Sequence, residues 1–356
     1  MKPALAYLTL RLPIEILALL TAGIIPQGPG ATGMPPMFGP LQAFMRWDSG
    51  WYLRIIESGY SYSPTEQSSI AFWPLFPMAV KAVAWVMPIP LASFVVVHVS
   101  LILALAGVHR LALRYEVRPD YAMAAVLLYP SSFFLSVGYA EALFLALCVW
   151  AFVCYEEGRP VAAGILVMGA VLCRSQGVLL CAALVLGAVL RRRVVGRMAV
   201  SVAVSGLVAV AVHMAAVNWL TGDPLAMLHA RAAWGYDGNV WEAASIYAGW
   251  AFSGEAGAAG WLNLATVPLL ALYGVGAWIL LGPAYGLLAL GVLAAPLLSG
   301  QLWGLSRISL AALVPVALVV AASAEGRPRF WGSVALASGA SVAVNGVLFV
   351  NGWSAD

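Results

Sequence analysis

Long apolar runs dominate the sequence, and short polar stretches separate them. Runs of about 20 apolar residues predict membrane-spanning helices, whereas a membrane β-barrel would show alternation. We expect a first span that ends near Ile25, with its N-terminus in the cytoplasm. Further spans are expected over 91–112, 120–138, 140–155, 161–173, 177–190, 198–220, 263–282, 284–299, 308–323 and 330–350. The fold class is therefore predicted as all-α, a polytopic membrane protein of about eleven helices in which 161–173 and 177–190 form a short hairpin.

Composition supports this prediction and excludes other classes. The chain is 63% hydrophobic and 9% charged, whereas average proteins carry about 25% charged residues. A net charge of +3, spread along the chain, indicates no nucleic-acid partner. The four cysteines lie in apolar runs and the four histidines have no ligand spacing, so we expect neither a metal site nor a cofactor. The preference for arginine over lysine, with much Ala, Gly and Val, is typical of a bacterial GC-rich genome.

The basic residues predict how the chain is oriented. Under this topology twelve of the 18 basic residues are cytoplasmic: Lys2, Arg11, Arg110, Arg114, Arg118, Arg159, Arg191, Arg192, Arg193, Arg197, Arg327 and Arg329. By the positive-inside rule, the long segments 26–90 and 221–262 then face outward. We therefore expect one integral domain over 1–356 in the cell membrane, or in the ER membrane of a eukaryote, with membrane lipids around it.

One carboxylate stands out in the first outward segment. If 44–60 is a helix, Phe44, Asp48, Trp51 and Ile55 share one face. A carboxylate on an apolar face is costly unless it is paired or neutralised. Asp48 therefore either pairs with a loop cation such as Arg46 or Arg54, or it has a chemical role. Residues 72–87 are expected to lie along the outer interface.

The outward segments also collect cations and aromatic residues. Arginine suits a phosphate, Trp and Tyr suit a sugar ring, and grooves between helices suit a lipid tail. This inventory fits a lipid-linked substrate with an anionic head group. Aromatic residues alone are weak evidence, because aromatic belts occur in many membrane proteins.

Several segments resemble one known family. Arg46–Ile55 (RWDSGWYLRI) and Ala71–Pro77 (AFWPLFP) resemble the first outer loop of the PIG-V family of mannosyltransferases. Tyr129–Ser136, Tyr139–Phe144 and Cys173–Gly177 resemble later family segments, as does the pair Ser306-Arg307. PIG-V proteins belong to the GT-C class of polyprenol-dependent glycosyltransferases, so the resemblance implies a GT-C-like fold.

The resemblance implies an enzyme and assigns roles to residues. It implies inverting transfer of a sugar, by analogy mannose, from a polyprenyl-phosphate donor to a hydroxyl of a lipid or glycan acceptor at the outer face. Asp48 would act as general base, and partial desolvation would make it a stronger one. The expected substrate-binding residues are Arg46, Trp47, Trp51, Tyr52, Glu141, Arg174 and Arg307. Arg174 and Arg307 are the candidates for the leaving phosphate, without a metal.

Two other hypotheses about the function use the same residues. A transporter or flippase of a lipid-linked sugar would need the cations and aromatics but no base. A non-catalytic subunit of a glycan-assembly complex would be active only with a partner. The change Asp48→Asn distinguishes a transporter from an enzyme, since transport can survive the loss of a base whereas sugar transfer should not. Two of these residues also have a structural interpretation. Arg174 would be a charge that closes the short hairpin, and Glu141 would be a capping or buried hydrogen-bonding group.

Overall fold

The computed structural model describes residues 1–28, 36–191, 195–233, 239–253, 257–300 and 302–353, and this part of the chain is helical with connecting turns. Six of its helices are long and apolar enough to cross a membrane: Pro3–Thr21, Ile89–Arg114, Gly196–Thr221, Gly260–Leu280, Leu305–Ala324 and Pro328–Val350. Three more apolar helices, Pro160–Cys173, Gln176–Leu190 and Pro283–Leu298, are shorter. The chain is thus an all-helical polytopic membrane protein, as the apolar runs predict.

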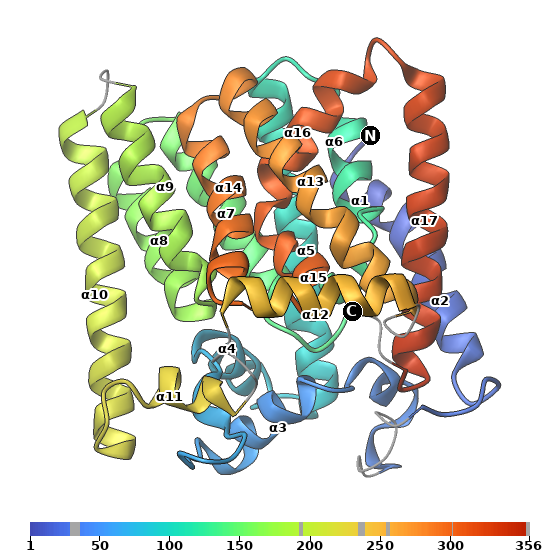
Figure 1. Ribbon diagram of the computed structural model, residues 1–356, viewed down its shortest axis with the longest axis vertical. Helices are drawn as coiled ribbons and strands as arrows, with labels where there is room; N and C mark the ends of the chain where they lie inside the picture. Colours follow the sequence, from blue (N-terminus) through green and yellow to red (C-terminus); the bar gives the residue numbers. More distant parts are fainter. Residues whose placement is uncertain (29–35, 192–194, 234–238, 254–256, 301, 354–356) are drawn as a thin grey trace.

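The helices are numbered in chain order (Figure 1). They are α1 (Pro3–Ala6), α2 (Leu12–Thr21), α3 (Ser49–Ser58), α4 (Leu75–Val83), α5 (Ile89–Arg114), α6 (Pro119–Leu127), α7 (Glu141–Glu156), α8 (Pro160–Cys173), α9 (Gln176–Leu190), α10 (Val195–Thr221), α11 (Ala226–Ala232), α12 (Val240–Ser253), α13 (Gly257–Leu280), α14 (Pro283–Leu298), α15 (Leu305–Ile308), α16 (Leu313–Ala324) and α17 (Pro328–Val350). A π-helical turn, Tyr7–Arg11, joins α1 to α2.

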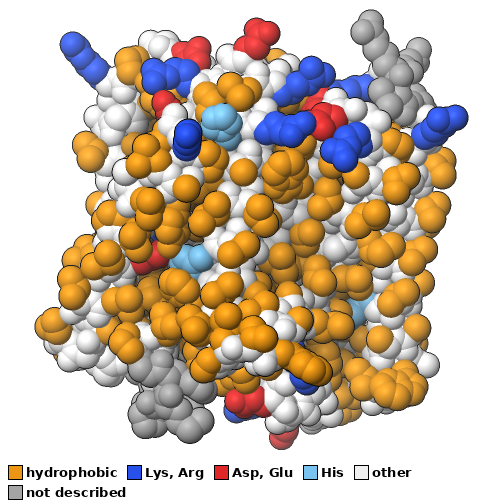
Figure 2. Space-filling model, turned by 180° about the vertical axis from the view of Figure 1, so that it is seen from behind, with side chains coloured by type: hydrophobic (Ala, Val, Ile, Leu, Met, Phe, Trp, Pro, Cys, Tyr) orange, Lys and Arg blue, Asp and Glu red, His pale blue; other side chains and the backbone are white. Residues whose placement is uncertain are grey.

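Charged side chains gather at one edge of the molecule. The turns between α5 and α6, α7 and α8, α13 and α14, and α16 and α17 all lie at the top of Figure 1. Lys, Arg, Asp and Glu side chains crowd this edge in Figure 2, and a broad hydrophobic band lies below it. We call it the charged edge. Arg192 and Arg193 of the predicted cytoplasmic set lie outside the described residues.

Helix length differs across the bundle, and the difference makes room for a site. α10 has 27 residues, which is about 40 Å at 1.5 Å per residue. Its neighbours α8 and α9 have 14 and 15 residues and reach only about 21–23 Å. Their connecting turn therefore ends inside the thickness that α10 spans. The helices α3, α4 and α11 occupy the space beyond it, at the bottom of Figure 1.

The predicted span 120–138 is wrong as a single helix. α6 ends at Leu127, and the segment 128–140 folds as turns around a 3₁₀ turn, Ser132–Leu135, before α7 begins. Pro130 explains the break, because proline disfavours helical geometry at the preceding residue and lacks an N–H. The segment is nevertheless buried, with Ser131, Ser132 and Leu135 all fully enclosed.

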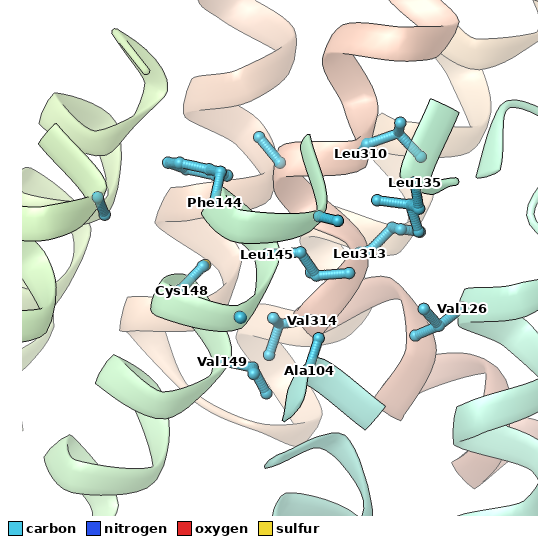
Figure 3. Packing of buried hydrophobic residues seen from close by; sticks show 14 of the residues in the cluster. Ala104, Val126, Leu135, Phe144, Leu145, Cys148, Val149, Leu310, Leu313 and Val314 are labelled. Carbon is cyan, nitrogen blue, oxygen red and sulfur yellow. The ribbon is translucent and has the colours of Figure 1, made fainter. Parts of the chain in front are cut away.

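The core of the bundle forms around α7. Phe144, Leu145, Cys148 and Val149 pack near Ala104 of α5 and against Leu310, Leu313 and Val314 (Figure 3). Gly107 permits the close approach of α5, since a Cβ there would lie 2.8 Å from Val149. Small residues at helix contacts let membrane helices pack tightly. Cys148, Cys154 and Cys173 are buried and unpaired, as expected for small hydrophobic residues.

Candidate active site

Asp48 lies at the beginning of a helix and not in the middle of one. It precedes α3, which begins at Ser49, and the residue before it, Trp47, has a left-handed backbone (φ 51). Phe44 belongs to a separate 3₁₀ turn, so the predicted face of Phe44, Asp48 and Trp51 does not form. The buried face of α3 instead carries Ser49, Tyr52, Leu53, Ile55 and Ile56. The left-handed turn separates Asp48 from that core face.

Asp48 forms an ion pair with Arg307. Arg307 Nη1 lies 2.8 Å from Asp48 Oδ2, and the side chains of Arg307 and Asp48 are 21% and 27% exposed. Arg307 comes from α15, a single helical turn that begins after Gly304, whose φ of 67 is left-handed. The backbone N–H of Asp48 donates to the Tyr139 hydroxyl at 3.2 Å. Asp48 and Arg307, which are 259 positions apart in the sequence, thus both contact Tyr139.

A second ion pair lies beside the first. Arg174 Nη1 pairs with Glu141 Oε1, and Arg307 Nε lies 3.9 Å from the same oxygen. Glu141 is the first residue of α7, and Arg174 separates α8 from α9. The short helices therefore set the position of this pair, because both residues lie where a helix begins or ends. The four side chains form a row of alternating charge, from Asp48 to Arg174.

These groups line one cavity of about 300 Å³. Its walls are Asp48, Tyr52, Ala71, Phe72, Trp73, Tyr139, Glu141, Cys173, Arg174, Ser175, Gln176, Arg231, Trp303, Gly304, Arg307 and Ile308. Among these lining residues are three arginines and two carboxylates, an excess of one positive charge. Within the described residues, no three His, Cys, Asp or Glu side chains lie together as metal ligands. The cavity thus offers a carboxylate, cations and aromatic faces to one ligand.

Of the predicted site residues, five line this cavity: Asp48, Tyr52, Glu141, Arg174 and Arg307. Burial, followed by the charge of Glu141, raises the pKa of the Tyr52 phenol, so that it stays protonated and can donate. The other three predicted residues are not among the lining residues. Arg46 donates to the Val350 carbonyl at 3.3 Å, Trp47 is 41% exposed, and Trp51 stacks on Phe72.

The sequence analysis did not single out Tyr139 or Trp303, and it included Arg231 only as part of the outward segment 221–262. Tyr139 belongs to the family-like segment Tyr139–Phe144, in which only the acid Glu141 was predicted to bind substrate. Arg231 lies on α11 and its Nη2 donates to Ser175 Oγ at 3.2 Å. Nothing in the local sequence shows that α11 folds back onto the turn between α8 and α9.

Asp223 holds the beginning of α11. Its Oδ1 accepts the Leu225 N–H at 2.9 Å, and its Oδ2 lies 2.6 Å from His229 Nδ1. The Leu225 N–H, followed by His229 and Tyr62, lowers the pKa of the Asp223 carboxyl. The carboxylate is therefore the stable form, and it fixes the short helix that carries Arg231 to the cavity.

Known proteins match the part of the chain that builds most of this cavity. The model of the family described as Mannosyltransferase (PIG-V) matches residues 37–192. GPI alpha-1,6-mannosyltransferase 2 of Mus musculus is 34% identical over 154 residues, which cover 39% of this chain and 30% of that protein. The protein of the same name from Rattus norvegicus is 32% identical over 180 residues, which cover 43% of this chain and 36% of that protein. The match thus spans about a third of the length of these relatives.

No solved structure matches the chain significantly. The matched residues carry Asp48, Tyr52, Glu141 and Arg174 of the cavity, whereas Arg231 and Arg307 lie beyond them. Over residues 37–192 the chain is thus similar to the PIG-V mannosyltransferase family.

Proposed function

We propose that the chain is a membrane mannosyltransferase that uses a polyprenyl-phosphate mannose donor and a lipid or glycan hydroxyl as acceptor. The observation that carries this proposal is the convergence of Asp48, Arg307, Glu141 and Arg174 on one cavity. The family match supplies the reaction class, and the cavity supplies a base and cations in one place. A nucleotide donor is not needed to account for the charges.

The reaction is a single displacement. The acceptor oxygen attacks the anomeric carbon of the sugar, and the bond from that carbon to the phosphate oxygen breaks. Asp48 takes the proton of the acceptor hydroxyl, and the lipid phosphate leaves with the electron pair. Attack opposite to the leaving group inverts the anomeric centre. A positioned general base contributes about 10²–10⁴-fold to such a rate.

The arginines bind the phosphate and stabilise the charge that develops on it. The donor is a phosphodiester with one negative charge, which fits the excess of one cation among the lining residues. Arg307 is central, because in the resting site it neutralises Asp48. A donor phosphate competes for the same guanidinium. Donor binding therefore frees Asp48 to accept a proton, which favours a sequence in which the donor binds before the acceptor.

The charged edge supports an outward-facing site. Helix ends that carry predicted cytoplasmic arginines, such as Arg114 of α5 and Arg159 before α8, lie at that edge, whereas α11 and α3, which follows Asp48, lie toward the opposite one. By the positive-inside rule, we place the cavity on the extracytoplasmic side of the membrane. There a polyprenyl-phosphate sugar meets acceptors that are already outside.

Sugar transfer in proteoliposomes tests the function. Purified protein receives radiolabelled polyprenyl-phosphate mannose and an extract of lipids and glycans as acceptors. Wild type should transfer label, Asp48→Asn should lose about 10²-fold or more, and Glu57→Gln, an exposed acid of α3, should match wild type. If Asp48→Asn transfers label as fast as wild type, the base assignment is wrong. If wild type moves the donor across the bilayer without transfer, the flippase reading replaces the enzyme.

A further inference from the structure

Arg11 is a buried cation in the first membrane span. It lies in the helix Pro3–Thr21, ends the π-helical turn Tyr7–Arg11, and has no exposed surface. The sequence analysis counted Arg11 among the cytoplasmic basic residues, and the structure buries its side chain within the first span. A charge inside a membrane span is costly and marks function or a specific partner. Widened π turns are also common at functional sites.

The partner of Arg11 is the broken end of α6. Arg11 Nη2 donates to the Leu127 carbonyl at 2.7 Å and to Ser132 Oγ at 2.7 Å. Ser132 Oγ donates to the same carbonyl at 2.8 Å. Leu127 is the last residue of α6, where the carbonyls lack partners and carry the negative end of the helix dipole. Water cannot satisfy them in an apolar interior, so the guanidinium takes that role.

The segment that Arg11 holds leads directly to Asp48. Residues 128–140 connect α6 to Glu141, and the Gly138 N–H donates to the Phe44 carbonyl at 3.0 Å. Tyr139 accepts the Asp48 N–H at 3.2 Å. Gly138 has no room for a side chain, since a Cβ would lie 2.5 Å from Met45 Sδ. The start of the segment is thus fixed by Arg11, and its end contacts Asp48 and leads into Glu141, the two cavity carboxylates.

The first span is itself held in place. Glu15, one turn beyond Arg11, accepts the Tyr7 hydroxyl at 2.8 Å and lies 3.4 Å from His98 Nε2 of α5. Glu15 and His98 are both buried. The helix that carries Arg11 is therefore tied to α5 by polar contacts as well as by packing. This makes it a rigid support for the segment 128–140.

We propose that Arg11 is a positioning residue of the active site, which acts through residues 128–140 to place Tyr139 and Glu141 against Asp48. The proposal rests on the proposed function. It also extends the site to a residue outside the family match, which begins at residue 37. Arg11 contacts Leu127 and Ser132, which lie outside the cavity lining, so its effect passes through the backbone that follows Leu127.

Kinetics of Arg11 variants test the proposal. Arg11→Gln should lower kcat by about 10- to 100-fold, because small displacements of reacting groups are costly. The donor KM should stay within about twofold, since the phosphate-binding arginines are untouched. Arg11→Lys should restore most of kcat, because an ammonium can also donate to Leu127 and Ser132. Thr9→Val, an exposed change on the same helix, should match wild type.

A double variant separates positioning from a general loss of stability. Arg11→Gln and Tyr139→Phe should be non-additive in kcat, because both act on the support of Asp48. If their effects multiply, or if Arg11→Lys is no better than Arg11→Gln, the proposal is overturned.

Hydrogen exchange tests the same idea without activity. Amides of 128–140 should exchange faster in Arg11→Gln than in wild type or Thr9→Val, while those of α10 stay unchanged. Unchanged exchange in 128–140 would overturn the proposal even if the enzyme is active. Faster exchange in a protein whose wild type shows no transfer would instead leave the anchor in place and reject the proposed function.

Discussion

Arg307 and Asp48 are 259 positions apart in the sequence, and their side chains form an ion pair of 2.8 Å. The carboxylate that the family motif presents is thus paired with a cation from outside the matched residues. Of its neighbours in sequence, Arg46 donates to the Val350 carbonyl and Arg54 lies over the Trp51 ring. The pair links the beginning and the end of the chain at the cavity.

The first prediction concerns Arg307. Arg307→Gln should raise the donor KM about tenfold or more, because a charge-assisted hydrogen bond to phosphate contributes about 1.5–3 kcal/mol. Arg307→Lys should fall between this variant and wild type, since lysine keeps the charge without the planar fork. The control is Arg329→Gln, an exposed cation at the beginning of α17. Steady-state transfer at varied donor concentration gives the result, and an unchanged KM would remove Arg307 from phosphate binding.

The second prediction concerns the pair of Glu141 and Arg174. Their side chains are 4% and 16% exposed, so the loss of one partner leaves a buried charge that costs about 3–5 kcal/mol. Glu141→Gln and Arg174→Gln should each lower the Tm in detergent. The double variant should recover part of the Tm, because neither charge is then left alone. A double variant no more stable than the two single ones would show that the pair is not coupled.

The third prediction concerns the turn between α8 and α9. Gly177 donates its N–H to the Arg174 carbonyl at 2.9 Å, and a Cβ there would overlap the backbone of Ala170 and Val171. Gly177→Ala should therefore destabilise the protein by about 1–3 kcal/mol and displace Arg174. Gly332→Ala in α17, where a Cβ meets open space, should be neutral or stabilising by about 0.5–1 kcal/mol. Thermal unfolding of both variants compares them, and equal Tm values would contradict the packing.

The fourth prediction concerns sidedness. Thr65→Cys lies in the exposed segment between α3 and α4, and Arg159→Cys lies at the charged edge. The native cysteines are buried or half-buried, which keeps the background low. In intact cells, a membrane-impermeant maleimide should label Thr65→Cys, and it should label Arg159→Cys only after permeabilisation. The reverse pattern would place the cavity on the cytoplasmic side.

Local pattern was enough for the fold class and for much of the site. The apolar runs predict most of the helices, because the membrane imposes length and hydrophobicity on every span independently of its neighbours. The motif around Asp48 and the later segments with Glu141 and Arg174 can also be recognised from the local sequence. The same local signals gave a wrong prediction where a left-handed residue interrupts an apparently helical spacing. The apolar spacing of Phe44 and Asp48 suggested one helix, and the left-handed Trp47 divides it.

The apolar pattern and one motif are enough to predict a helical membrane protein with a carboxylate in a family-like segment. Which charges meet depends on the packing of the helices. Asp48 meets Arg307, Arg231 reaches Ser175, and Arg11 caps α6 at Leu127. A buried charge pairs with the polar group that lies near it in space, and here those groups lie at the ends of helices. Those ends depend on how short and long helices pack together, which no local pattern records.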